Sequence, residues 1–218
     1  MKLDEEMYDL EAIYDYQAKQ QMEEGGRTWL GNRLKILYVF RRAAKYLRPG
    51  MHVCEIGVGE GYLLLLLRSS RLNLKVTGID ISGYLIRKLM RLKDLGIDLI
   101  KHDISKPVDK NLIQRFDVVF ALDVLEHVEA LEEAIGNIGN IGRLLKPNGL
   151  LIATVPWKEN LADNMVMCPV CRHVFHRWGH FHSFHSLSDV VEMLGASFKI
   201  IEYDFVRLSL EEKIKEFF

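Results

Sequence analysis

The sequence predicts an α/β fold in which helices cover both faces of a mostly parallel sheet. Short apolar runs alternate with helical segments from residue 51 onward. These runs are almost continuously apolar, as in strands that are buried on both faces. The first run, 53–56, leads into a turn with three closely spaced glycines. The chain has 218 residues, 49% of them hydrophobic, which is enough for the core of one such domain.

The elements can be assigned in order along the chain. Helical periodicity over 8–47, interrupted by Gly25-Gly26, predicts two or three helices ahead of the sheet. Pro49-Gly50 then separates an N-terminal helical lid (1–48) from the main domain (49–218). The expected strands are 53–56, 75–79, 98–102, 116–121, 149–155 and 198–206, and the expected helices are 62–72, 82–95, 128–145 and 188–194. Residues 160–186 form an insertion, and connections of that length are usually functional or otherwise stabilised.

Composition excludes several classes of protein. The formal net charge of −1 provides no overall field that attracts nucleic acid or an anionic membrane. The first residues are acidic, unlike a secretory signal, and the longest apolar run, 62–67, is far shorter than the ~20 residues of a spanning helix. Three cysteines are too few for a disulfide scaffold, and Cys54 fits a buried strand. We therefore expect a soluble, cytoplasmic protein.

The glycine turn favours a nucleotide-type cofactor. Gly57, Gly59 and Gly61 follow a strand and precede a helix, so backbone N–H groups can approach a ligand closely. Their spacing is G-x-G-x-G, and Tyr62 takes the place after Gly61 where a dinucleotide fold shows its third glycine. The spacing therefore disfavours NAD. A tight turn that binds no ligand would have the same pattern.

Acidic residues follow the next two strands. Asp80 lies about 20 residues beyond the glycine turn, where a carboxylate can accept both ribose hydroxyls. The alternative is that Asp80 or Ser82 caps the following helix. Asp103 follows the third strand, where it could accept an adenine amino group while Ile104 offers its backbone N–H. A turn aspartate explains Asp103 equally well.

Taken as an ordered set, several segments resemble the class I S-adenosylmethionine-dependent methyltransferases, in particular the small methyltransferases of ubiquinone and menaquinone biosynthesis. The segments are 55–61, Asp80, Asp103-Ile104, 116–128 and 145–151, within a resemblance that covers roughly 47–206. It implies a Rossmann-like α/β/α sandwich. It also implies that Glu55 and the glycines bind the methionine end of the cofactor, Asp80 the ribose, Asp103 and Ile104 the adenine, and the Ala121 carbonyl the methionine amino group. The expected cofactor contacts are Glu55, Gly57, Gly59, Gly61, Asp80, Ile81, Asp103, Ile104 and Ala121. The family's final antiparallel strand has no clear counterpart after Val206.

Asp123, Glu126 and His127 are the candidate acceptor-site residues. We expect them on one face of a helix that opens at Asp123, with Asp123 and His127 as catalytic groups that remove a proton. Alternatively they only line the pocket, with Asp123 as an N-cap. A metal-using branch of the family carries Glu-x-x-Glu-His here and a later histidine. Asp123 replaces the first Glu, so the resemblance also implies a weakened site for Mg²⁺ or Mn²⁺.

The insertion carries a second metal motif. Cys168, Cys171, His176 and His180 have the C-x2-C-x4-H-x3-H spacing that can close a tetrahedron around zinc. His173 or His182 could replace either histidine. The alternative is a pair of reduced thiols beside histidines that serve the active site, and the stretch from His180 to Phe184 resembles one that lines the family's acceptor pocket.

These observations favour a methyltransferase that uses S-adenosylmethionine and a small-molecule acceptor. Two other functions stay open, namely a metal-assisted RNA methyltransferase and a non-catalytic, zinc-containing module that binds RNA or protein. The basic clusters at 41–48 and 87–93 are typical of solvated helix faces, and they leave RNA as a minor possibility.

Overall fold

The computed structural model describes residues 14–16, 19, 27–127, 131–167, 172 and 174–206. Its central sheet has five parallel strands in the order β3-β2-β1-β4-β5. They are β1 (His52–Ile56), β2 (Lys75–Asp80), β3 (Ile97–Lys101), β4 (Phe116–Leu122) and β5 (Leu145–Thr154). The predicted Rossmann-like α/β/α sandwich is confirmed.

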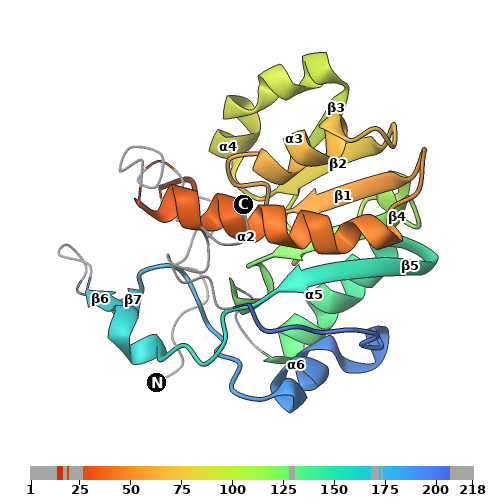
Figure 1. The fold of residues 1–218 in the computed structure, drawn as a ribbon. Coiled ribbons are helices and arrows are strands. Elements are labelled where there is room, and N and C mark those ends of the chain that lie inside the picture. The colour runs from red at the N-terminus through yellow and green to blue at the C-terminus, as the bar shows by residue number, and fades with distance from the viewer. Residues whose placement is uncertain are drawn as a thin grey trace, which may run out of the picture.

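Helices cover both faces of the sheet. Figure 1 shows α3 and α4 on one side, α5 and α6 on the other, and α2 crossing beside the first group. Their bounds are α2 (Arg27–Ala43), α3 (Tyr62–Ser69), α4 (Gly83–Lys88), α5 (Leu131–Leu144) and α6 (Leu187–Leu194). The 3-10 helices are η2 (Ala44–Tyr46), η3 (Met90–Leu95), η4 (Lys110–Leu112), η5 (Leu125–His127), η6 (Leu161–Asn164) and η7 (Gly195–Ser197).

The alternation of side chains along each strand produces two apolar cores. On β1, Val53 packs in the core that α2, α3 and α4 share. Its neighbour Cys54 is also fully buried, but it points to the opposite core beneath α5 and α6. Because successive strand residues face opposite sides, β1 has to be apolar at almost every position.

The N-terminal helix α2 is integrated into the first core. Val39 and Ala43 are buried there together with Leu63 of α3. This packing places Lys35, one turn earlier on α2, at the carboxyl end of the sheet, where it reaches Asp123.

The expected strand at 198–206 is wrong, because this segment has no regular secondary structure. Its acidic residues alternate with apolar ones and bind side chains of α2 and η2. Glu202 accepts hydrogen bonds from Arg42 Nη2 at 2.6 Å and Lys45 Nζ at 2.5 Å. Asp204 accepts from the Tyr38 hydroxyl at 2.8 Å. These contacts tie the segment to α2 in place of a ladder with the sheet.

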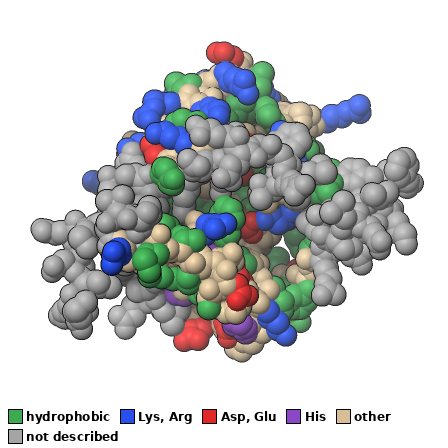
Figure 2. All heavy atoms as spheres, turned by 90° about the vertical axis from the view of Figure 1, so that its left-hand side faces the viewer, with side chains coloured by type: hydrophobic (Ala, Val, Ile, Leu, Met, Phe, Trp, Pro, Cys, Tyr) green, Lys and Arg blue, Asp and Glu red, His purple; other side chains and the backbone are tan. Residues whose placement is uncertain are grey.

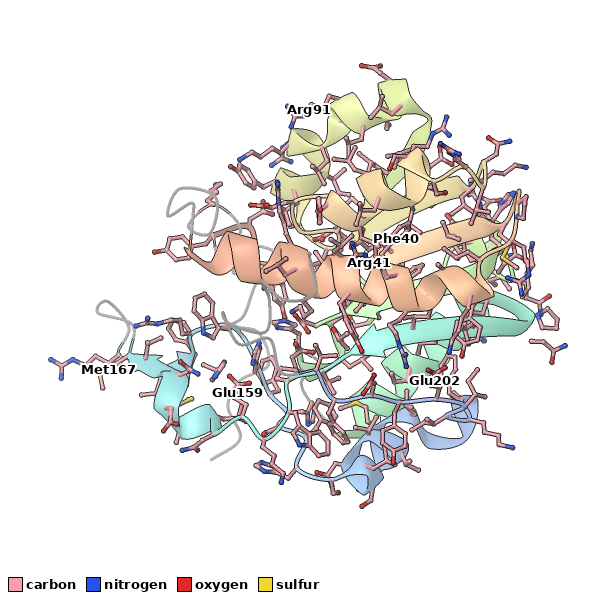
Figure 3. All side chains as sticks on the ribbon, in the orientation of Figure 1. Phe40, Arg41, Arg91, Glu159, Met167 and Glu202 are labelled. Atoms are coloured by element: carbon pink, nitrogen blue, oxygen red, sulfur yellow. The ribbon has the colours of Figure 1, made fainter. Side chains whose placement is uncertain are left out.

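Two further elements differ from expectation. The helix expected over 82–95 divides at Leu89, whose φ of −90° and ψ of 1° end α4 before η3 begins. The insertion has structure of its own, an antiparallel hairpin of β6 (Met165–Met167) and β7 (Val174–His176). Met167 is near the tip of this hairpin, away from the sheet (Figure 3). None of the helices in the described ranges combines the length and apolar character needed to cross a membrane.

Candidate functional site

The carboxyl ends of four neighbouring strands bring the predicted cofactor residues to one edge of the sheet. Ile56 pairs with Ile79 on one side and with Ala121 on the other. Asp80 pairs with Lys101, two residues before Asp103. The glycine turn, Asp80, Asp103 and Ala121 therefore share this edge, which is where open parallel sheets bind their ligands.

The glycine turn needs glycine for conformation and for space. Gly57, Gly59 and Gly61 have φ values of 72°, 47° and 74°, in the left-handed region. A Cβ on Gly57 would lie 2.7 Å from Val124 Cγ2. The turn and the segment after β4 can pack this closely only because Gly57 has no side chain.

Asp80 connects the glycine turn to the start of α4. Its Oδ2 accepts from the Val58 N–H and its Oδ1 from the Ser82 N–H, both at 2.8 Å. Burial raises the pKa of Asp80 to about 6, although these backbone hydrogen bonds oppose the rise. Ser82 caps α4, since its side chain accepts from the Leu85 N–H. The capping role that the sequence left open thus belongs to Ser82.

Glu55 lies beneath the glycine turn and is 3% exposed. Burial and then the nearby Asp80 raise the pKa of this carboxyl well above its usual value. Its Oε2 has no hydrogen-bond partner within the described part of the chain. A buried polar atom without a partner is unusual, and cofactor binding by Glu55 stays a prediction.

The adenine-side residues form a turn. Asp103 Oδ1 accepts from the Ser105 N–H at 2.9 Å, which is the turn geometry proposed as an alternative from the sequence. Ile104 is half-buried, and its carbonyl accepts from Asn140 Nδ2 at 2.9 Å. Ile81, between Asp80 and Ser82, is also half-buried. Adenine binding by this group stays a prediction.

Residues near the N-terminus cover part of the same edge. Asp15 accepts hydrogen bonds from the Ser82 hydroxyl and from the Tyr84 N–H. The Tyr14 ring packs edge-on against His127, with 5.7 Å between the ring centroids. One short segment therefore touches both the Asp80 side and the His127 side of the site.

Asp123 does not open a helix, contrary to expectation. Its φ is 53°, and the helical turn η5 begins only at Leu125. Its Oδ1 accepts from the Thr154 hydroxyl at 2.8 Å, and its Oδ2 forms an ion pair with Lys35. Both oxygens are thus engaged, and burial lowers the pKa of Lys35. Lys35 also interacts electrostatically with Glu126, so this one cation lies near both acids.

Glu126 and His127 meet the insertion at η5. Glu126 is 0% exposed, and neither of its carboxylate oxygens has a hydrogen-bond partner among the described residues. Burial raises the pKa of Glu126 to about 7. Burial, and then the nearby His180, lowers the pKa of His127 to about 4, so its imidazole is neutral. His127 Nδ1 lies 3.1 Å from the Gly179 carbonyl oxygen, which can only accept, so Nδ1 carries the proton and Nε2 keeps a lone pair.

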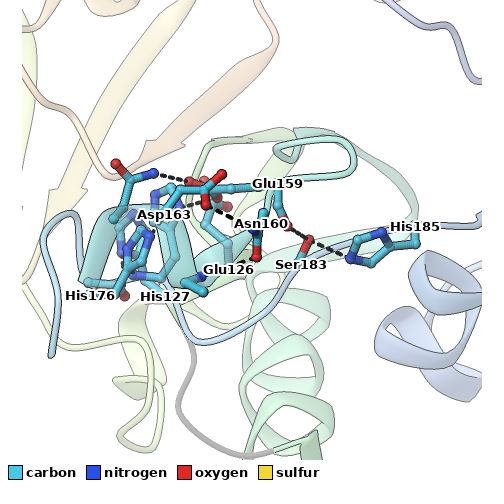
Figure 4. Close-up of polar contacts among 12 residues, drawn as sticks. Glu126, His127, Glu159, Asn160, Asp163, His176, Ser183 and His185 are labelled. Carbon is cyan, nitrogen blue, oxygen red and sulfur yellow. Dashed lines mark hydrogen bonds and ion pairs between the residues drawn. The ribbon is translucent and has the colours of Figure 1, made fainter. Parts of the chain in front are cut away.

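His176 and His180 lie together, as the sequence predicted, and Glu159 joins them. Figure 4 labels His176 and Glu159 in this region. His180 Nδ1 is 2.6 Å from Glu159 Oε2, and His176 Nε2 is 3.6 Å from Glu159 Oε1. The two imidazole rings stack with centroids 4.7 Å apart. The other expected zinc ligands, Cys168 and Cys171, and the alternative His173 lie outside the described residues. The zinc set stays a prediction.

These side chains make two groups whose ligand atoms are close enough to share a cation. One contains Glu126, His127 and His180, and the other contains Glu159, His176 and His180. Glu159 and Lys35 were missed in the sequence. Glu159 is a single acid after β5 and Lys35 is a helix residue far from the motifs, so no local pattern distinguishes either one.

The basic clusters have ordinary surroundings. Arg42 and Lys45 pair with Glu202, which explains part of the first cluster. The second cluster lies on α4 and η3, and Figure 2 shows basic side chains at this end of the molecule. Figure 3 labels Arg91 there, far from Glu159.

The sequence and the fold match known proteins. A family model described as "Methyltransferase domain" matches residues 31–201. Ubiquinone biosynthesis O-methyltransferase from Bradyrhizobium sp. (strain ORS 278) is 30% identical over 140 residues, which are 59% of this chain and 53% of that protein. The enzyme of that name from Rhodopseudomonas palustris (strain BisB5) is 33% identical over 125 residues, 55% of this chain and 47% of that protein. The chain thus spans about half the length of these curated relatives.

Solved structures show the same fold. A protein of Pyrococcus horikoshii OT3 matches with a TM-score of 0.58 and 21% identity, over 75% of this chain and 80% of that one. Phosphoethanolamine N-methyltransferase 2 of Haemonchus contortus, solved in complex with S-adenosyl-L-methionine, matches with a TM-score of 0.53 and 20% identity, over 75% of this chain and 36% of that one. Since the family model covers most of the chain, from α2 to the segment after α6, the chain belongs to the methyltransferase-domain family.

Proposed function

We propose that this protein transfers the methyl group of S-adenosylmethionine to a hydroxyl oxygen of a small molecule. The observation that carries the proposal is the continuity of β4 with η5. Ala121 is the second-last residue of β4, at the cofactor edge, and the chain reaches Glu126 and His127 one short turn later. The ubiquinone O-methyltransferase names of the relatives support a small, hydroxyl-bearing acceptor.

The cofactor would lie across the glycine turn and Asp80. The carboxylate of Asp80 would accept from the ribose hydroxyls, and the unpartnered oxygen of Glu55 would meet the methionine end. S-adenosylmethionine supplies a sulfonium methyl that is already activated for displacement. The task of the protein is therefore to align the acceptor oxygen in line with the methyl–sulfur bond and to exclude water.

His127 Nε2 is the proposed proton acceptor. When the acceptor oxygen takes the methyl group, the carbon–sulfur bond breaks, S-adenosylhomocysteine leaves, and the hydroxyl proton moves to Nε2. The hydrogen bond between Nδ1 and the Gly179 carbonyl fixes the tautomer that this transfer needs. Asp123 would act indirectly, by holding Lys35 and Thr154 beside the site.

A metal-assisted form of the same reaction is the second candidate. Glu126, His127 and His180 would hold the ion, and the two buried carboxylate oxygens of Glu126, which lack hydrogen-bond donors, fit that use. A donor set with two imidazoles suits Mn²⁺ better than Mg²⁺. When bound, such an ion lowers the pKa of a hydroxyl that contacts it.

The proposal is tested with radiolabelled S-adenosylmethionine and a panel of phenols, catechols and total RNA. We expect label in small phenolic products, and a His127→Ala variant that loses 10²- to 10⁴-fold in single-turnover rate. His185→Gln, which changes an exposed histidine of the insertion, is the matched control. Label in RNA alone would support the RNA alternative.

Calorimetric titration with S-adenosylmethionine and S-adenosylhomocysteine distinguishes an enzyme from a binding module. We expect both compounds to bind the wild-type protein. If neither compound gave a heat of binding, the result would contradict the proposed function. Removal of metal with EDTA, followed by addition of Mn²⁺, separates the two modes of hydroxyl activation, because only the metal-assisted form loses activity and then recovers it.

A further inference from the structure

We propose that Glu159 is a positioning residue that holds the His180 imidazole in a single tautomer, with its Nε2 lone pair directed at Glu126 and His127. The inference deepens the proposed function, since it assigns a role at that site to residues of the insertion. It begins from the place of Glu159, between the β6–β7 hairpin and the sheet (Figure 3).

The hydrogen bond between His180 and Glu159 fixes the proton on His180. The distance from Nδ1 to Glu159 Oε2 is 2.6 Å, and an ionised carboxylate can only accept. A proton therefore lies on Nδ1, and in the neutral ring Nε2 carries the lone pair. That Nε2 is 4.0 Å from Glu126 Oε1. A carboxylate behind an imidazole, as here, is the usual way in which proteins orient a histidine toward a bound group.

His176 lies beside the other carboxylate oxygen of Glu159. Its Nδ1 accepts the backbone N–H of His180 at 3.1 Å, so in the neutral ring the proton lies on Nε2. That Nε2 is buried and 3.6 Å from Glu159 Oε1. Both oxygens of Glu159 thus face an imidazole N–H. The His176 N–H is too far from Glu159 for a hydrogen bond, so His180 is the donor to this carboxylate. A cation bound by Glu159, His176 and His180 would have to displace these protons, and we therefore expect none there.

His180 and His127 are oriented in the same way, each by a hydrogen bond at its Nδ1. His127 Nδ1 donates to the Gly179 carbonyl, and His180 Nδ1 donates to Glu159, so each neutral ring keeps its lone pair on Nε2. One ligand atom of each ring lies within 4.8 Å of a carboxylate oxygen of the fully buried Glu126. Their ring centroids are 5.0 Å apart. The carbonyl of Glu126 also accepts from the N–H groups of Phe181 and His182 at 2.8 and 3.3 Å, which fixes the insertion against η5.

The experiment reads the tautomer directly. Selective ¹⁵N labelling of the eight histidines, with His180 assigned through His180→Gln, reports which ring nitrogen is protonated in the 218-residue chain. We expect His180 to be protonated on Nδ1 in the wild type and to become a mixture of tautomers in Glu159→Ala. Asp163→Asn is the control, because Asp163 is an exposed acid of the same segment whose carboxylate bonds Asn160.

Mn²⁺ titration followed by electron paramagnetic resonance gives the second readout. We expect one Mn²⁺ per chain, bound 10- to 100-fold more weakly by Glu159→Ala and unchanged in Asp163→Asn. An unchanged His180 tautomer in Glu159→Ala, two Mn²⁺ per chain in the wild type, or equal Mn²⁺ affinity in both proteins would overturn the proposal. If the wild type binds no Mn²⁺, the metal-assisted mode fails, and the tautomer alone decides the role of Glu159.

Discussion

The Val58 N–H donates to Asp80 Oδ2 at 2.8 Å and so fixes the glycine turn to the end of β2. The hydrogen bond makes the shape of the turn depend on the charge of one buried carboxyl. When Asp80 is ionised, it is a strong acceptor both for this amide and for ribose hydroxyls.

Binding of S-adenosylhomocysteine should therefore weaken in acid. Burial raises the pKa of Asp80 to about 6. Because the bound state needs the ionised form, affinity should be constant above pH 7 and about 10-fold lower at pH 5, where about one molecule in ten is ionised. Calorimetry across this range measures the effect. The Asp80→Asn variant should bind weakly with no such pH dependence, and a wild-type profile that is flat from pH 7 to 5 contradicts the assignment.

Asp15→Asn should move this acid transition to lower pH. The negative charge of Asp15 contributes to the raised pKa of Asp80, so its removal favours the ionised carboxyl. The hydrogen bonds from Ser82 and Tyr84 to an amide oxygen can persist, which makes the change mainly one of charge. The same calorimetric series measures the shift. A transition displaced to higher pH would contradict this coupling.

Gly57→Ala should lower the free energy of unfolding more than a substitution of another glycine with equal backbone strain. The new Cβ would lie 2.7 Å from Val124 Cγ2 at a φ of 72°. We expect a loss of about 2–4 kcal/mol in unfolding free energy, from left-handed strain and overpacking together. At Gly50, φ is 77° and the space around an added Cβ is open. Gly50→Ala should therefore lower the free energy of unfolding by only about 1 kcal/mol. Urea denaturation compares the two, and equal losses would exclude a steric role for Val124.

Lys35→Met should lower the rate of methyl transfer without weakening cofactor binding. Lys35 pairs with Asp123, which lies on the acceptor side of the site, and the substitution leaves the Asp123 carboxylate with Thr154. We expect roughly a 10-fold fall in single-turnover rate, since a partly buried charge loses its partner. Arg42→Met, on the same helix but paired with Glu202, is the control. Equal rates in the two variants would show that the ion pair has no part in turnover.

Glu202→Ala should loosen the segment over 198–206 and leave the site intact. The segment has no ladder, and Glu202 accepts hydrogen bonds from Arg42, Lys45 and Tyr46. Amide hydrogen exchange should become faster over this segment and stay unchanged in β1 and β4. Faster exchange throughout the sheet would mean that the segment supports the core.

Local sequence patterns were sufficient to predict the five strands of the sheet and the edge at which the glycine turn and Asp80 lie. Strands buried on both faces are apolar at nearly every position, and Gly57 and Asp80 follow strands that pair as neighbours. The pattern failed at 198–206, where alternation of apolar and acidic residues imitates a strand. The acids there pair with α2, and only tertiary structure shows that partner.

The acceptor side was predicted only in part. His127, His176 and His180 were recognised by type and spacing, and the structure brings them near one another. The left-handed turn at Asp123 could not be inferred, since helix propensity suggested a regular start. Glu159 and Lys35 reach the site from separate elements, so their contributions depend on long-range packing.

The Glu126 carbonyl receives two N–H groups from the insertion, and this contact involves main-chain atoms only. The Phe181 side chain is exposed and takes no part in these two hydrogen bonds. A substitution of Phe181 can therefore alter the surface of the loop while its main chain stays docked on η5.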